Sequence, residues 1–123
     1  MLRMRGLTII VATADPARFH AALSLAAAQA ALERPARLFL QAGAVALLRQ
    51  PVAAPDDARY SAAGIPRLGE LLDEAIALGV TVIACQSGLV LAGMQAGQLP
   101  AGVETGGLVG LLTQTEDDRL IVA

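Results

Sequence analysis

Cys85 is the only cysteine of the chain, and its position gives the first indication of chemistry. It directly follows Val80–Ala84, an apolar run that is predicted to be a buried strand, and a helix is predicted to begin at Ser87. A thiol at the start of a helix meets free backbone N–H groups and the positive end of the helix dipole, which favour the nucleophilic thiolate. The position therefore predicts a reactive cysteine. The residues leave a second interpretation open, in which Cys85 packs as a buried and inert apolar side chain.

Polar side chains near the same end of the predicted sheet could assist Cys85. His20 lies one turn into the first predicted helix and could activate the thiol as a Cys–His pair, although a single histidine is more often a surface or core residue. Gln41, Gln86 and Ser87 could donate hydrogen bonds to an anionic sulfur, and Ser87 is equally suited to cap the helix. The predicted site is therefore catalytic Cys85 with the substrate-binding residues His20, Gln41, Gln86, Ser87 and Gly88.

The counts of cysteine and histidine limit metal and redox chemistry. One cysteine excludes a disulfide within the chain and a thiolate-rich metal cluster. Because His20 is the only histidine, a zinc site would need ligands from several chains. No metal and no cofactor is predicted. A chain without a disulfide fits a reducing compartment, so we expect a cytoplasmic location.

Strands and helices that alternate along the chain position these residues. Apolar, β-branched runs predict strands, and amphipathic or Ala-rich stretches predict helices. The predicted strands are Leu7–Thr13, Arg37–Gln41, Val80–Ala84 and Leu120–Val122, with a further short strand within residues 97–104. The predicted helices are Pro16–Glu33, Gly43–Leu48, residues 66–79, Ser87–Gly93 and Thr105–Thr115. Residues 49–66 are predicted to form a loop that is either functional or mobile.

This alternation within 123 residues predicts an α/β fold with a single domain over residues 1–123. The expected sheet is mostly parallel, has four or five strands and carries helices on both faces. Ligands of such sheets bind where the strands end, which is where Cys85 and Gln41 are expected to lie.

Composition excludes several classes of protein. A chain that is 55% hydrophobic and 16% charged, with a net charge of −2, is too apolar for a disordered segment. It has no basic run and few aromatic rings, so we expect no nucleic acid partner. The glycines of residues 106–110 match neither phosphate-binding fingerprint, which disfavours nucleotide binding. So few charges on so small a domain predict a homo-oligomer that buries apolar surface.

Two stretches imitate membrane segments. Residues 1–14 combine a positive start, an apolar run and an A-x-A end, but they are shorter than the usual ~15–30 residues of a signal peptide. Residues 75–103 carry no charge, but Gly79, Gly88 and Pro100 are among the residues that interrupt the stretch. A soluble protein without a membrane partner is expected.

The region around Cys85 resembles the DsrE/DsrF-like family of small sulfur-relay proteins, which includes DsrE, TusD and YchN-like proteins. The resemblance is carried by Val80–Gly88 (VTVIACQSG), by Gly93 and by Gly102–Leu108 (GVETGGL). The order of elements in the first half of the chain is similar as well, so the resemblance covers nearly all of the chain.

This resemblance implies a three-layer, flavodoxin-like domain that assembles into trimers or hexamers. Family members that act in sulfur relay carry a persulfide on an active cysteine, and Cys85 falls at that position. The implied function is a sulfur carrier or sulfurtransferase that works between donor and acceptor proteins. Two positions depart from the family pattern. Gly88 stands where some relatives have the second cysteine of CxxC, so sulfur must leave to another protein or a small thiol. Ala92 stands where relatives often have arginine.

Two other functions are open at this stage. The chain could be a non-catalytic oligomeric or small-ligand-binding member of the same fold, with Cys85 buried and inert. It could also be a one-cysteine oxidoreductase that reacts with a peroxide, but there is no Arg or Thr beside Cys85 to polarise the peroxide.

Overall fold

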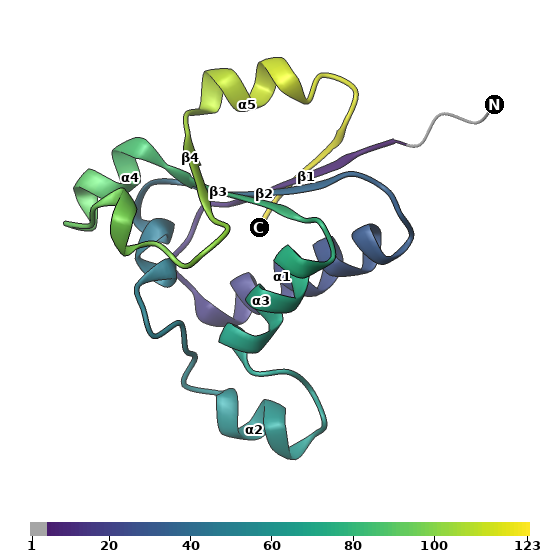
Figure 1. Ribbon diagram of the computed structural model, residues 1–123, viewed down its shortest axis with the longest axis vertical. Coiled ribbons are helices and arrows are strands. Elements are labelled where there is room, and N and C mark those ends of the chain that lie inside the picture. The colour runs from purple at the N-terminus through teal and green to yellow at the C-terminus, as the bar shows by residue number, and fades with distance from the viewer. Residues whose placement is uncertain (1–4) are drawn as a thin grey trace.

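The computed structural model describes residues 5–123, which form a five-stranded parallel sheet between two layers of helix (Figure 1). The strand order is β4-β3-β2-β1-β5. The strands are β1 (Leu7–Val11), β2 (Ala36–Leu40), β3 (Thr81–Cys85), β4 (Glu104–Gly106) and β5 (Arg119–Val122). The helices are α1 (Pro16–Ala31), α2 (Asp57–Ala62), α3 (Leu68–Ala77), α4 (Gln86–Leu91) and α5 (Leu108–Gln114), with short 3-10 helices η1 (Ala42–Leu48) and η2 (Ala96–Gln98).

The two faces of the sheet are covered unequally. Helices α1 and α3 lie side by side under one face, and α5 alone lies over the other (Figure 1). Between the sheet and α1 and α3 is the main core, where Phe19, Leu23, Leu38 and Leu72 are buried. The predicted α/β fold with a parallel sheet of four or five strands and helices on both faces is therefore confirmed.

Asp15 caps the start of α1, because its carboxylate accepts a hydrogen bond of 2.9 Å from the backbone N–H of Ala17. The helix ends at Ala31, two residues before the predicted end, because Glu33 adopts a left-handed backbone conformation with φ of 60°.

Two predicted elements are wrong. The segment 49–66 is not entirely a loop, because it contains α2 and is fixed by Asp57, whose carboxylate accepts hydrogen bonds from the backbone N–H groups of Ala54 (3.0 Å) and Leu68 (2.9 Å). Burial raises the pKa of Asp57, but these two hydrogen bonds and the nearby charge of Arg67 act in the opposite direction, and its pKa lies below the ordinary value. Thr105 was expected to start a helix, but it pairs with Ala84 of β3 as part of β4, and α5 begins only at Leu108.

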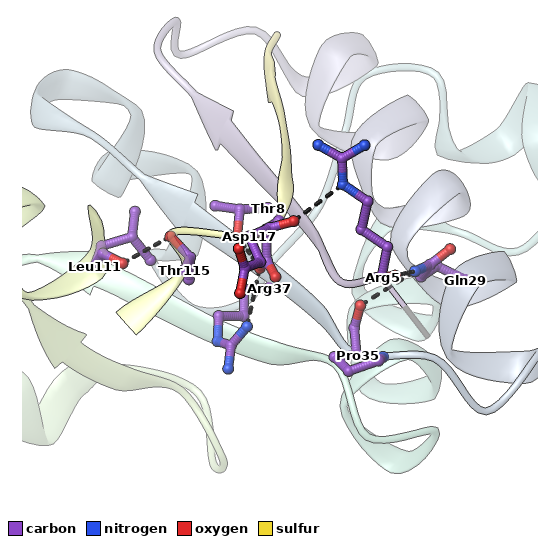
Figure 2. Close-up of polar contacts among 9 residues, drawn as sticks. Arg5, Thr8, Gln29, Pro35, Arg37, Leu111, Thr115 and Asp117 are labelled. Carbon is purple, nitrogen blue, oxygen red and sulfur yellow. Dashed lines mark hydrogen bonds and ion pairs between the residues drawn. The ribbon is translucent and has the colours of Figure 1, made fainter. Parts of the chain in front are cut away.

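A polar cluster anchors β5 to the sheet at the amino ends of the strands. The carboxylate of Asp118 accepts hydrogen bonds from the hydroxyl of Thr8 (2.7 Å) and from the guanidinium of Arg37 (3.0 Å), which are neighbours on β1 and β2. Arg5 donates to the backbone carbonyl of Asp117 at 3.0 Å (Figure 2). A cleft of about 620 Å³ is lined by Arg5, Arg37, Asp117 and Asp118 among others. Within it, Arg37 and Asp118 form an ion pair and neutralise each other's charge.

No helix among residues 5–123 is long and apolar enough to cross a membrane. The uncharged stretch 75–103 instead contains the end of α3, then β3, α4 and η2. Residues 7–11 of the signal-like amino-terminal stretch form β1, and residues 1–4 lie outside the described part of the chain.

Candidate functional site

Cys85 is the last residue of β3 and lies at the carboxyl edge of the sheet, as the sequence predicted. It stays in register with Gly106 of β4, and α4 begins at the next residue, Gln86. The abrupt change from strand to helix leaves the Cys85 side chain between α4 and the start of η1. Its exposed fraction is 9%, so the thiol is largely shielded from water but not sealed.

Hydrogen-bond donors from two segments surround the sulfur of Cys85. They are the backbone N–H groups of Ala42, Ser87 and Gly88 together with the side chain of Ser87. The Cys85 side chain makes no cap hydrogen bond to α4. The donors favour the thiolate because an anionic sulfur is the stronger acceptor. Burial raises the pKa of the Cys85 thiol, but the hydrogen bonds lower it by more, and the pKa lies below that of an ordinary cysteine.

The chain reversal after β2 brings the N–H of Ala42 to this site. Gln41 ends the strand pairing by donating its backbone N–H to the carbonyl of Val11 at 3.0 Å. Ala42 then adopts a left-handed conformation with φ of 49°, which is uncommon for a residue with a side chain. The carbonyl of Gln41 accepts from Ala44 at 3.0 Å, and η1 follows across the edge of the sheet.

Gly88 allows α4 to pack directly on η1. A Cβ atom at this position would overlap the carbonyl oxygen of Ala42 and the side chain of Val45. The missing side chain therefore keeps two of the donors, Ala42 and Gly88, close to the same sulfur. The same overlap explains why a CxxC motif cannot be accommodated here: a cysteine at position 88 has no room while η1 keeps its place.

The other predicted site residues are distributed as follows. Ser87 and Gly88 lie at Cys85, as predicted from their positions after β3. Gln41 and Gln86 are adjacent in sequence to Ala42 and Cys85, but neither side chain makes a hydrogen bond within residues 5–123. Gln86 is exposed and Gln41 is half-buried, so they stay candidates for contacts with a bound molecule.

His20 does not form the predicted pair with Cys85 in the described part of the chain. Its Nε2 donates to the carbonyl oxygen of Pro66 at 2.9 Å, and its ring stacks on Tyr60 with 4.1 Å between ring centroids. The expectation was based on the position of α1 at the carboxyl edge of the sheet. The ring instead fastens α1 to the segment 49–66, so His20 has a structural role.

Two residues near the site were not predicted from the sequence. Ala42 was missed because every residue has a backbone N–H, and only the left-handed turn directs this one toward Cys85. Arg49 donates to the carbonyl oxygen of Ala92 at 2.7 Å, at the carboxyl end of α4. It therefore places a cation at the end of α4, although it comes from a different part of the sequence.

Among residues 5–123 no three side chains of His, Cys, Asp or Glu are grouped so that they could hold a metal ion. The arrangement around Cys85 suits thiolate chemistry, because it combines a nucleophile with donors that also stabilise an anionic sulfur attached to it.

Comparisons with known proteins identify the fold but not the function. No family model matches the chain, and no curated protein matches it. Among solved structures, the chain is similar to a protein of unknown function from Methanobacterium thermoautotrophicum. The two are 22% identical, the alignment covers 97% of this chain and 99% of that one, and the TM-score is 0.66.

Replacing Ser87 with alanine removes the side-chain donor but keeps both backbone donors of α4. We expect the rate of alkylation of Cys85 at neutral pH to fall about threefold, because a fraction of a pKa unit is lost. The measurement is the rate of reaction with iodoacetamide, followed by mass spectrometry. Ser61→Ala on α2 is the matched control. An unchanged rate for Ser87→Ala would show that the side chain does not act on the thiolate.

Proposed function

We propose that this protein is a sulfur carrier of the DsrE/DsrF-like type, which relays sulfane sulfur as a persulfide on Cys85. The single observation that carries the proposal is the placement of the only cysteine among donors from Ala42, Ser87 and Gly88, which favour its thiolate. The sequence resemblance around Cys85 supports the same function. The match to a protein of unknown function supports the fold alone.

The proposed relay has two thiol-exchange steps without net oxidation. In the first, the Cys85 thiolate attacks the outer sulfur of a donor persulfide, a new S–S bond forms on Cys85, and the donor's inner sulfur leaves as a thiolate. In the second, an acceptor thiolate attacks the outer sulfur of the Cys85 persulfide. The Cys85 S–S bond then breaks and the Cys85 thiolate is restored. Because no second cysteine exists, the acceptor must be another protein or a small thiol.

The donors around Cys85 would act in both steps. They stabilise the attacking thiolate in the first step and the departing thiolate in the second. Gln41 and Gln86, whose side chains are without partners in residues 5–123, are placed to contact the outer sulfur or the small thiol that delivers it.

We further propose that the carrier works as a cytoplasmic homo-oligomer. Large apolar side chains are exposed on α4, α5 and β5, with Val90 and Val109 each 82% exposed. So much exposed apolar surface on a small domain marks a protein interface. Donor and acceptor proteins are the other expected partners.

The test of the proposed function is the loading of sulfur onto the intact protein. Incubation with a polysulfide is expected to add the mass of one sulfur atom to the wild type, and a reductant is expected to remove it. Cys85→Ser is the control and is expected to gain nothing. Because the pKa of Cys85 is lowered, the rate of its alkylation should reach half of its maximum at a lower pH than for free cysteine.

The competing interpretation, a ligand-binding protein with an inert Cys85, predicts the opposite result. In that case no sulfur is added, and alkylation of Cys85 occurs only after unfolding in denaturant. This pair of results would overturn the sulfur-carrier proposal.

A further inference from the structure

We propose that β5 is the surface at which two copies of this chain associate, by antiparallel pairing of β5 with β5 about a two-fold axis. The pairing would join two five-stranded sheets into one continuous sheet. The inference rests on the homo-oligomer of the proposed function and assigns a surface to it. It does not depend on the chemistry of Cys85.

The backbone of β5 has one edge without a partner among the described residues. β5 is the outermost strand beside β1. The N–H groups of Arg119 and Ala123 point inward, because they donate to the carbonyls of Gly6 (3.0 Å) and Ile10 (2.8 Å). Backbone groups of alternate residues point to opposite sides of a parallel strand, so those of Leu120 and Val122 point outward. Such groups are a template for another strand.

The last three side chains of β5 are apolar and exposed, and they alternate between the two faces of the sheet. The exposed fractions are 52% for Leu120, 40% for Ile121 and 64% for Val122. Beside them, an apolar groove of about 510 Å³ lies between β5 and α1 and includes Leu25 and Leu32. An interface along this edge would therefore bury side chains as well as pair backbone groups.

The opposite edge of the sheet looks protected. β4 has only three residues, it begins with the exposed carboxylate of Glu104, and Gly106 and Gly107 follow. Short edges with charges are the usual defence against strand pairing. β5 also begins with an exposed charged residue, Arg119, but its other three residues are apolar, so nothing between Leu120 and Val122 opposes strand pairing.

Charge favours a second copy in antiparallel orientation as the occupant. The segment 120–122 carries no charge, so it can face itself without repulsion. Arg119 is the only charged residue of β5. In an antiparallel pair with Leu120 opposite Val122, the two Arg119 side chains lie at opposite ends of the ladder, four residues or about 13 Å apart along the strands at ~3.3 Å per residue. A parallel pair in register would place them side by side.

The test is the mass of the assembly in solution, measured by light scattering after size exclusion. The wild type is expected to be a dimer or a larger assembly with an even number of chains. Leu120→Pro removes an outward N–H but none of the hydrogen bonds to β1, and proline is tolerated on the open side of an edge strand. We expect this variant to have at most half the mass of the wild-type assembly and to retain its circular dichroism spectrum.

Two further variants keep the test decisive. Val122→Lys leaves the backbone intact and places a charge in the proposed interface, so it should also reduce the mass at least twofold. Leu78→Lys changes an exposed apolar residue at the end of α3, away from β5, and should leave the mass unchanged. A wild type with an odd number of chains, or an assembly that survives both β5 variants, would overturn the pairing. A monomeric wild type would overturn the homo-oligomer as well, whereas sulfur loading of Cys85 is measured separately.

Discussion

Replacing Gly88 with alanine is expected to slow the alkylation of Cys85 at neutral pH by about tenfold and to destabilise the fold. The added Cβ would overlap the carbonyl of Ala42 and the side chain of Val45, so α4 and η1 must move apart. This movement draws the N–H of Ala42 away from the sulfur. A rise of about one pKa unit in Cys85 reduces the thiolate roughly tenfold. Overpacking of this kind costs about 1–3 kcal/mol of unfolding free energy.

Gly110→Ala is the matched control for this prediction. Gly110 lies within α5, and nothing would contact a Cβ atom placed there within 4 Å. Because alanine is a better helix former than glycine, the control should be as stable as the wild type or more stable. Its Cys85 should react at the wild-type rate.

The measurement for Gly88→Ala is the pH dependence of Cys85 alkylation, with urea unfolding as the readout of stability. The midpoint of the alkylation profile should move to higher pH in Gly88→Ala and stay in place in Gly110→Ala. A variant that is destabilised but keeps the wild-type midpoint would show that Gly88 serves packing only and that Ala42 does not hold the thiolate.

The elements with strong local patterns were predictable from the sequence. All five residues of β1, Leu7–Val11, are buried, and a continuous apolar run of this length identifies a strand that is covered on both faces. α3 was equally clear, because its buried leucines recur at helical spacing and Gly79 follows with a φ of 103°.

Elements that depend on distant contacts could not be predicted. α2 buries none of its residues, so it has no apolar face, and its position depends on Asp57 accepting hydrogen bonds from Ala54 and Leu68. Thr105 has no local signal that distinguishes strand from helix. It is a strand residue because Ala84 of β3 lies beside it.

The same division applies to the candidate site. The position of Cys85 between strand and helix was predictable from the sequence. Ser87 and Gly88 were predictable for the same reason, because they follow Cys85 at the start of the helix. Ala42 was not predictable, because its contribution is a backbone N–H directed by a φ of 49°. The expectation for His20 failed for a related reason. Its position along α1 was correct, but its partners, Tyr60 and Pro66, belong to a segment that the sequence left undefined.

Replacing Asp118 with alanine is expected to lower the unfolding free energy by about 2–3 kcal/mol, or the melting temperature by about 10 °C. Its carboxylate is the hydrogen-bond acceptor for the fully buried hydroxyl of Thr8 and for Arg37. The variant leaves that hydroxyl without its acceptor in the sheet. It also loses the contact with Gly6, which lies so close to the carboxylate that a Cβ there would overlap it. Thermal unfolding measures the effect, with exposed Asp73→Ala on α3 as the control.

A double-mutant cycle separates the buried hydroxyl from the other contributions of Asp118. In a Thr8→Val background no hydroxyl needs an acceptor, so the cost of Asp118→Ala should fall by about 1 kcal/mol or more. An unchanged cost in that background would assign the stability to Arg37 and the turn instead. Since Asp118 leads directly into β5 at the far end of the strands from Cys85, alkylation of folded Cys85 should stay at the wild-type rate in all of these variants. A slower rate in Asp118→Ala would show that the two ends of the sheet are coupled.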